Sequence, residues 1–105
     1  MFIVNLTYIK PLDEVEKHLE KHIDFLNQYY TEGHFIASGR KNPRTGGIIL
    51  MRAKNKDAVQ EIIAHDPFYQ NEIAQYEIIE FEASKYCLEL KTLLSDPLDE
   101  NEEIK

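Results

Sequence analysis

The chain has 105 residues, with 19 acidic side chains against 12 basic ones and a formal net charge of −7 at pH 7. This length predicts a single domain with a modest core, so burial against a second copy would add stability. The acidic balance excludes a general attraction for phosphate backbones or anionic lipid. We therefore expect neither a nucleic-acid partner nor a membrane partner.

Cysteine content and hydropathy bear on the compartment. The single cysteine, Cys87, cannot form a disulfide within the chain, which suits a reducing environment. The N-terminal sequence MFIVNLTYIK has no basic leader, and no apolar run approaches the roughly 18 residues of a membrane span. These features favour a cytoplasmic protein.

The first third of the chain predicts a strand followed by a long helix. Residues 2 to 9 alternate with the period of a strand. Apolar residues then recur at helical spacing from Pro11 until Gly33, which predicts one helix between them.

A β-hairpin follows in the predicted order. Residues 34 to 39 form a short strand, and the β-rich segment 47–53 forms its partner. The turn-rich sequence NPRTGG at 42–47 connects the two strands.

The next segments complete the domain. Asn55 or Asp57 can cap a second helix, which Pro67 ends. Residues 68–73 are predicted as a loop or short helix, and residues 74–82 as a strand. The order is β-α-β-β-α-β, which predicts an α+β, ferredoxin-like fold with a four-stranded antiparallel sheet and two helices on one face.

From Ser84 the pattern weakens, and we treat residues 87–105 as a C-terminal extension. The leucines of residues 86–94 predict either a short helix or an arm exchanged with a partner subunit. Residues 96–105 are acidic, and we expect a flexible, solvated end.

Apolar side chains point to both faces of the predicted sheet. Ile48 and Leu50 alternate with Ile49 and Met51, and Ile78 alternates with Ile79 and Phe81. Two helices cover one face, and the other would leave an apolar patch on a monomer. The simplest cover is the same face of a second copy, so we expect a homodimer or a larger assembly.

His22 is the first candidate catalytic residue. On a helical wheel of about 100° per residue, Leu19, Leu26 and Tyr29 fall within about 40° of Val15. His22 lies in the middle of this apolar stripe. Burying an imidazole without a hydrogen-bond partner costs about 1–3 kcal/mol, so the fold must supply a partner.

Asp66 is the second candidate. It stands directly before Pro67, which favours an extended backbone at Asp66. It is also in register with the apolar residues of the second predicted helix, so it can meet His22 or share one cleft with it. A carboxylate on one imidazole nitrogen fixes the tautomer and leaves the other nitrogen free for proton transfer. The alternative is a buried pair that only stabilises helix packing.

The segment ASGRKNPRTGG contains candidate substrate-binding residues. Ser38 offers a hydroxyl at a strand end, Gly39 lets a ligand approach the backbone, and Arg40 can bind a carboxylate through two hydrogen bonds. The alternative for this segment is an ordinary exposed hairpin loop.

Other features predict no cofactor and no metal. His18 and His22 have the i, i+4 spacing of some zinc ligands, but no HExxH motif or acidic third ligand accompanies them. GGIIL lacks the GxGxxG spacing of a dinucleotide site. We expect His34 and His65 to face solvent and Cys87 to be unreactive.

Several of these segments together resemble the YCII-related family, over about residues 1 to 86. They are His22 in the first helix, EGHFIASG at 32–39, GGIIL at 46–50, DPF at 66–68 and AQYEIIEF at 74–81. The resemblance implies a dimeric α+β barrel related to muconolactone isomerase, with His22 and Asp66 at the family's active-site pair. We include Phe68, from the DPF segment, among the substrate-binding candidates. Where this family often has proline after the Ser-Gly pair, this chain has Arg40.

The leading hypothesis is a cofactor-free acid/base enzyme of isomerase or lyase type. In it, His22 moves a proton on a small, anionic organic substrate while Asp66 orients the imidazole. Some members of the family act as lyases or dehydrochlorinases on ring-derived compounds, which fits this chemistry. Two alternatives remain: a binding module for a small molecule, and a structural dimer whose polar pair serves packing alone.

Overall fold

The computed structural model describes residues 1–95. Its elements, in chain order, are β1 (Phe2–Tyr8), α1 (Leu12–Lys17), α2 (Leu19–Thr31), β2 (Phe35–Arg40), β3 (Gly46–Met51), α3 (Lys56–Ile63), α4 (Pro67–Gln70), β4 (Ala74–Glu80) and α5 (Leu88–Ser95). The predicted flexible end at residues 96–105 lies outside the described residues.

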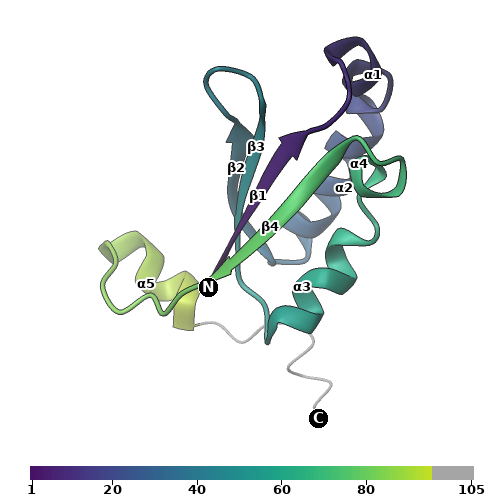
Figure 1. Cartoon of the computed structure of the whole chain (residues 1–105). Helices are drawn as coiled ribbons and strands as arrows, with labels where there is room; N and C mark the ends of the chain where they lie inside the picture. The colour runs from purple at the N-terminus through teal and green to yellow at the C-terminus, as the bar shows by residue number, and fades with distance from the viewer. Residues whose placement is uncertain (96–105) are drawn as a thin grey trace.

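The four strands form one antiparallel sheet in the order β2-β3-β1-β4, with β1 and β3 in the centre (Figure 1). In its register, Val4 of β1 lies between Ile49 of β3 and Ile78 of β4. This order confirms the predicted α+β, ferredoxin-like arrangement. Within one chain the sheet stays open and does not close into a barrel.

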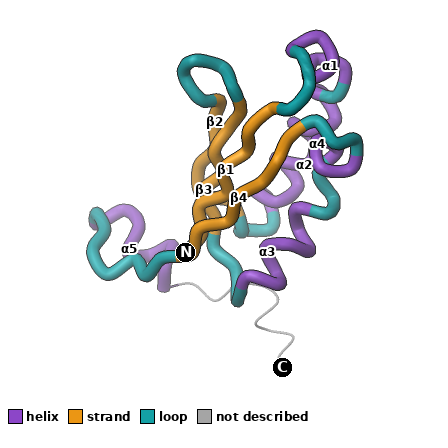
Figure 2. Tube along the Cα trace, viewed as in Figure 1, coloured by secondary structure: helices purple, strands orange, loops and turns teal. Residues whose placement is uncertain are grey.

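One face of the sheet carries the core. Phe2, Val4 and Leu6 alternate along β1 and are buried, as strand periodicity requires of a face covered by helices. The segments α1 to α4 lie together on this side (Figure 2). The first predicted helix is divided into α1 and α2, and the short helix α4 follows α3 where a loop or short helix was expected.

The predicted long helix breaks at His18. The backbone there has φ −112° and ψ 6°, which ends α1 and begins α2. Val15 and Phe25 are both buried, although on one unbroken helix they would point about 80° apart. The break therefore lets α1 and α2 each turn an apolar side toward the same sheet.

The second face of the sheet is open and partly apolar. Ile48, Ile79 and Phe81 are exposed on this chain, as the two-sided apolar pattern predicted. Residues beyond β4 continue into α5, the short helix that was one of two alternatives. This helix extends away from the helical layer (Figure 1), and its Leu88 is 77% exposed.

Arg52 connects α5 to the rest of the domain. Its Nη1 donates to the Leu93 carbonyl at 2.6 Å, and its Nε donates to the Gly33 carbonyl at 3.0 Å.

In the part of the chain that the structure describes, no helix is both long enough and apolar enough to cross a membrane.

Gly46 provides a test of the β1–β3 pairing. A Cβ added at Gly46 would lie 1.8 Å from the Leu6 carbonyl oxygen, whereas one added at Gly39 would meet no atom within 4 Å. We expect Gly46→Ala to lower the free energy of unfolding by at least about 1–3 kcal/mol, because the backbone of β1 must move. Gly39→Ala should have a much smaller effect. Urea unfolding of the two variants measures the difference, and equal stabilities would contradict this pairing geometry.

Candidate functional site

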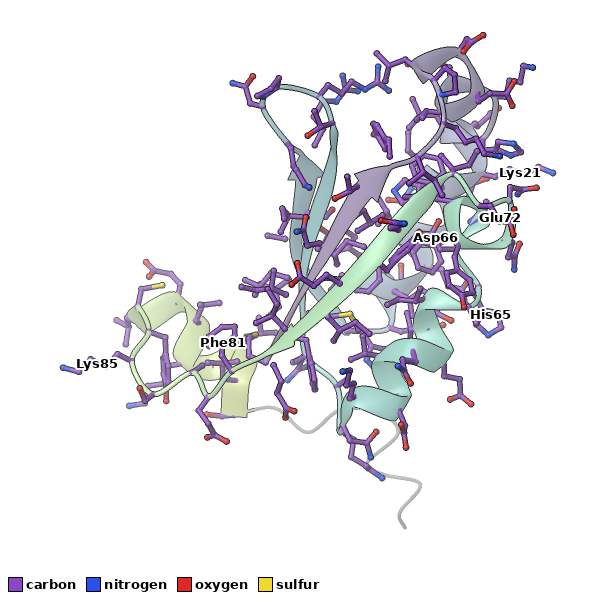
Figure 3. The ribbon with its side chains drawn as sticks, in the orientation of Figure 1. Lys21, His65, Asp66, Glu72, Phe81 and Lys85 are labelled. Carbon is purple, nitrogen blue, oxygen red and sulfur yellow. The ribbon has the colours of Figure 1, made fainter. Side chains whose placement is uncertain are left out.

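Asp66 occupies the junction between α3 and α4. The helical wheel assumed that Asp66 continues the second predicted helix. That helix, α3, ends at Ile63, so Asp66 lies beyond it. It has the extended backbone expected before proline, with φ −79° and ψ 123°, and it caps α4 by accepting a 2.9 Å hydrogen bond from the Phe68 N–H. Figure 3 shows Asp66 inside the fold, whereas the neighbouring His65 points outward.

The structure brings His22 and Asp66 together. His22 Nδ1 lies 2.8 Å from Asp66 Oδ1, and the Asp66 side chain has no solvent exposure. An ionised carboxylate only accepts hydrogen bonds, so Nδ1 carries the proton in this pair. The contact thereby selects the tautomer of the neutral imidazole and leaves the Nε2 lone pair available.

Phe68 fixes the plane of the His22 ring. The two rings stack with centroids 4.0 Å apart and an interplanar angle of 4°. Because Asp66 holds one edge of the imidazole and Phe68 holds one face, the ring has little freedom to rotate. The orientation of Nε2 is therefore set before any ligand binds.

Tyr76 completes the hydrogen bonds of the carboxylate and was missed from the sequence. Its hydroxyl donates to Asp66 Oδ2 at 2.5 Å from β4. Burial raises the pKa of Tyr76 far above its ordinary value, and the Asp66 charge raises it further, so the hydroxyl stays a donor. The alternation of β4, which places Tyr76 on the same face as Ile78, was the available signal.

A cleft of about 240 Å³ lies beside the pair. His22, Ser38, Gly39, Arg40 and Phe68 all line it, so five of the six candidate residues share one cavity. The sixth, Asp66, stands behind His22 and does not line the cleft. The remaining lining side chains are mainly apolar and include Leu6, Leu19, Ile23, Leu26, Ile48 and Ile49.

His22 lines this cleft, and its second ring nitrogen, Nε2, takes no part in the contact with Asp66. The His22 side chain is 12% exposed, and within residues 1–95 its Nε2 has no hydrogen-bond partner. The packing alternative predicts a pair with no role for Nε2, whereas the acid/base hypothesis requires Nε2 to be reachable from the cleft.

The hairpin side of the cleft is polar. The Ser38 hydroxyl is 2.8 Å from the Tyr30 hydroxyl, which fixes Ser38 at the wall. Arg44, from the β2–β3 connection, also lines the cleft, although sequence reasoning did not single it out. Arg44 reaches the cleft wall only because the β2–β3 hairpin packs near α1, and no local sequence pattern predicts that packing.

The other histidines lie away from the cleft. His65 is exposed, as expected, but the prediction that His34 faces solvent was wrong. His34 is buried because it follows the helix end at Gly33, where its Nδ1 lies 3.2 Å from the Arg52 carbonyl oxygen. Among residues 1–95, no three His, Cys, Asp or Glu side chains are placed to hold a metal ion.

Tyr76→Phe tests the support of the carboxylate. We expect the free energy of unfolding to fall by about 1–3 kcal/mol, because buried Oδ2 loses a donor while the ring is kept. The pKa of Tyr76 is raised in the folded protein, so its stabilising contribution is complete below about pH 10. The contribution declines at higher pH, where the unfolded chain ionises first. Urea unfolding at neutral pH and at about pH 11 measures both effects.

Tyr69→Phe is the matched control for this experiment. Tyr69 is exposed and packs edge-on against Tyr76, with ring centroids 5.6 Å apart. Removing its hydroxyl should leave stability within about 0.5 kcal/mol of the wild type. If both variants unfold at the same urea concentration, the Tyr76 hydroxyl does not support Asp66.

Comparisons with known proteins bear on the family and the fold of this chain. The model of the YCII-related domain matches residues 1–82. Among solved structures, the chain is similar to 5-chloro-2-hydroxyhydroquinone dehydrochlorinase (TftG) from Burkholderia phenoliruptrix AC1100, in complex with 2,5-dihydroxybenzoquinone. The two structures superpose with a TM-score of 0.66 and 16% sequence identity, over 78% of this chain and 94% of that chain. At this identity the likeness shows the fold alone. No curated protein matches the sequence significantly. Since the family model covers most of the sequence, the chain belongs to the YCII-related domain family.

Proposed function

We propose that this protein is a small, cofactor-free enzyme that uses His22 and Asp66 for acid/base chemistry on a small, anionic organic substrate. The observation that carries the proposal is that His22 lines the cleft while its Nδ1 is held by a fully buried carboxylate, which leaves Nε2 outside that contact. This is the geometry a general base requires, because one nitrogen is oriented and the other is accessible to substrate.

The proposed chemistry is proton transfer at a carbon next to a carbonyl or similar group. Nε2 of His22 takes the proton, and the imidazolium that forms is stabilised by the Asp66 carboxylate 2.8 Å from Nδ1. Returning the proton to another carbon gives an isomerisation. Loss of a neighbouring leaving group with its electron pair gives an elimination.

The YCII-related fold supports a reaction of this class. The similar structure is named as a dehydrochlorinase, and its bound molecule is a dihydroxybenzoquinone. A flat ring of that size is compatible with this cleft, because its walls are mainly apolar and include the stacked rings of His22 and Phe68. We therefore place hydroxylated or carboxylated rings first among the substrates to be tested.

Asp66→Asn tests this mechanism. The variant keeps the size of the side chain but removes the charge that favours a protonated imidazole. The pH at which His22 titrates by NMR should therefore fall. Turnover of a substrate such as 5-chloro-2-hydroxyhydroquinone should fall by about 10²–10⁴-fold with the fold intact.

Asp57→Asn is the matched control, because Asp57 is an exposed aspartate in the first turn of α3. It should change neither the His22 titration nor turnover. A loss of ligand affinity in Asp66→Asn, without any turnover in the wild type, would favour the binding module. If His22 titrates identically in the wild type and in Asp66→Asn, the two residues do not interact and the mechanism is wrong.

We also propose that two copies pair through their open sheet faces. Ile48 pairs with Asn5 and Ile79 pairs with Ile3, so both alternate with the buried residues of β1 and point to the open face, and Phe81 continues this alternation beyond Ile79. Pairing about a two-fold axis would bury these residues against the same residues of a second copy.

Sedimentation at micromolar concentration tests this proposal. The wild type should have about twice the chain mass of 12.3 kDa. Ile79→Lys should shift it toward the monomer, because Ile79 is 42% exposed on the open face. Leu12→Lys should leave the mass unchanged, since Leu12 is equally accessible at 46% but lies on α1. A monomeric wild type would contradict the proposal.

A further inference from the structure

Arg44 reaches the cleft from the connection between β2 and β3. Its Nη1 lies 2.7 Å from Glu16 Oε2, which anchors the guanidinium to α1. Hydrogen bonding to Glu16, and after it to Tyr8, raises the pKa of Arg44, so the side chain is always a cation. A fixed positive charge therefore lies in the wall that also contains His22.

In the described part of the chain, two nitrogens of this guanidinium have no hydrogen-bond partner. Nε and Nη2 of Arg44 are shielded from solvent, and within residues 1–95 neither makes a hydrogen bond. Buried donors are almost always satisfied in native proteins, so an unsatisfied pair at a cavity wall requires an explanation. A bound ligand whose oxygens accept hydrogen bonds from Nε and Nη2 would explain these two unsatisfied donors.

The identity of the two nitrogens defines the ligand. Nε and Nη2 form one edge of the planar guanidinium, and their N–H groups point in the same direction. This edge matches the two oxygens of a carboxylate, which it binds through two parallel hydrogen bonds. Glu16 uses Nη1 only, so it orients the guanidinium and leaves this edge free.

The surrounding charges favour the same ligand. The chain carries a formal net charge of −7, which repels anions from most of its surface. Among residues 1–95, two arginines, Arg40 and Arg44, and no acidic side chain line the cleft, while Glu16 pairs with Arg44 from outside this lining. An anion that reaches the cleft is therefore attracted to the hairpin side, opposite the apolar residues of α2.

We propose that Arg44 binds the carboxylate of the substrate through its Nε and Nη2 edge, and that the substrates are small carboxylic acids whose reactive carbon lies at His22 Nε2. This deepens the proposed function and rests on it for the role of His22. Because solvent does not reach the two nitrogens, binding includes a movement of the Arg44 side chain or of its neighbours that opens the edge to the cleft.

Benzoate and benzamide provide a direct test, because they share a ring and differ in the carboxylate. NMR of the full chain labelled with ¹⁵N should show a saturable shift of the Arg44 Nε–H signal on addition of benzoate. Benzamide at the same concentrations should give no such shift. This measurement uses the wild type, so it does not depend on whether a variant folds.

Variants then assign the binding to the guanidinium edge. Arg44→Gln and Arg44→Lys should each raise the Kd for benzoate by at least about tenfold, because lysine keeps the charge but lacks the planar edge. Lys41→Gln is the matched control, since it removes one positive charge from the same hairpin without lining the cleft. It should leave the Kd within about twofold.

The outcomes separate this proposal from the proposed function. His22→Asn should retain benzoate binding, because Arg44 and not His22 holds the carboxylate. If the wild type binds benzoate through Arg44 but turns over none of the carboxylic acids tested, only the catalytic role of His22 is disproved. The Arg44 proposal is overturned if benzoate gives no saturable Nε–H shift. Equal shifts by benzamide, or unchanged benzoate affinity in Arg44→Gln, would overturn it as well.

Discussion

A carboxylate without solvent exposure must receive hydrogen bonds from the protein, and this requirement organises the site around Asp66. Its two oxygens accept from the Phe68 backbone N–H, from His22 Nδ1 and from the Tyr76 hydroxyl. These donors come from α4, α2 and β4. The buried charge therefore holds two layers of the fold together at the point where the cleft begins.

In the proposed mechanism, the same hydrogen bonds prepare His22 for proton transfer. A carboxylate with three donors is a stable, charged acceptor, so it can orient the imidazole and stabilise the imidazolium. The stacked Phe68 ring removes the remaining rotation. Stability and function are linked here, since a change that weakens the Asp66 contacts also alters the position of Nε2.

Much of this arrangement could be predicted from local patterns. Strand alternation and helical spacing gave the order of the elements. The inward direction of His22 follows from the apolar stripe in which it lies, and Pro67 accounts for the extended backbone of Asp66. The contact between His22 and Asp66 then required only that α2 and the junction between α3 and α4 lie on the same face of the sheet.

The remaining features depend on tertiary contacts. No glycine or proline marks the break at His18, which arises because α1 and α2 must both face one sheet. Tyr76 becomes a partner of Asp66 only through the register of β4, 10 residues along the chain from Asp66. Arg44 reaches the cleft because the hairpin packs near α1, where Glu16 holds it. Each of these contacts joins segments that pattern analysis treats separately.

The central claim is that Asp66 holds the proton on Nδ1 of His22 and leaves Nε2 as a base in the cleft. Long-range ¹H–¹⁵N correlation of the imidazole signals, at a pH where His22 is neutral, measures the tautomer directly. The account predicts that His22 carries its proton on Nδ1 and that ligand binding in the cleft perturbs Nε2 more than Nδ1. A neutral His22 with its proton on Nε2 would contradict it.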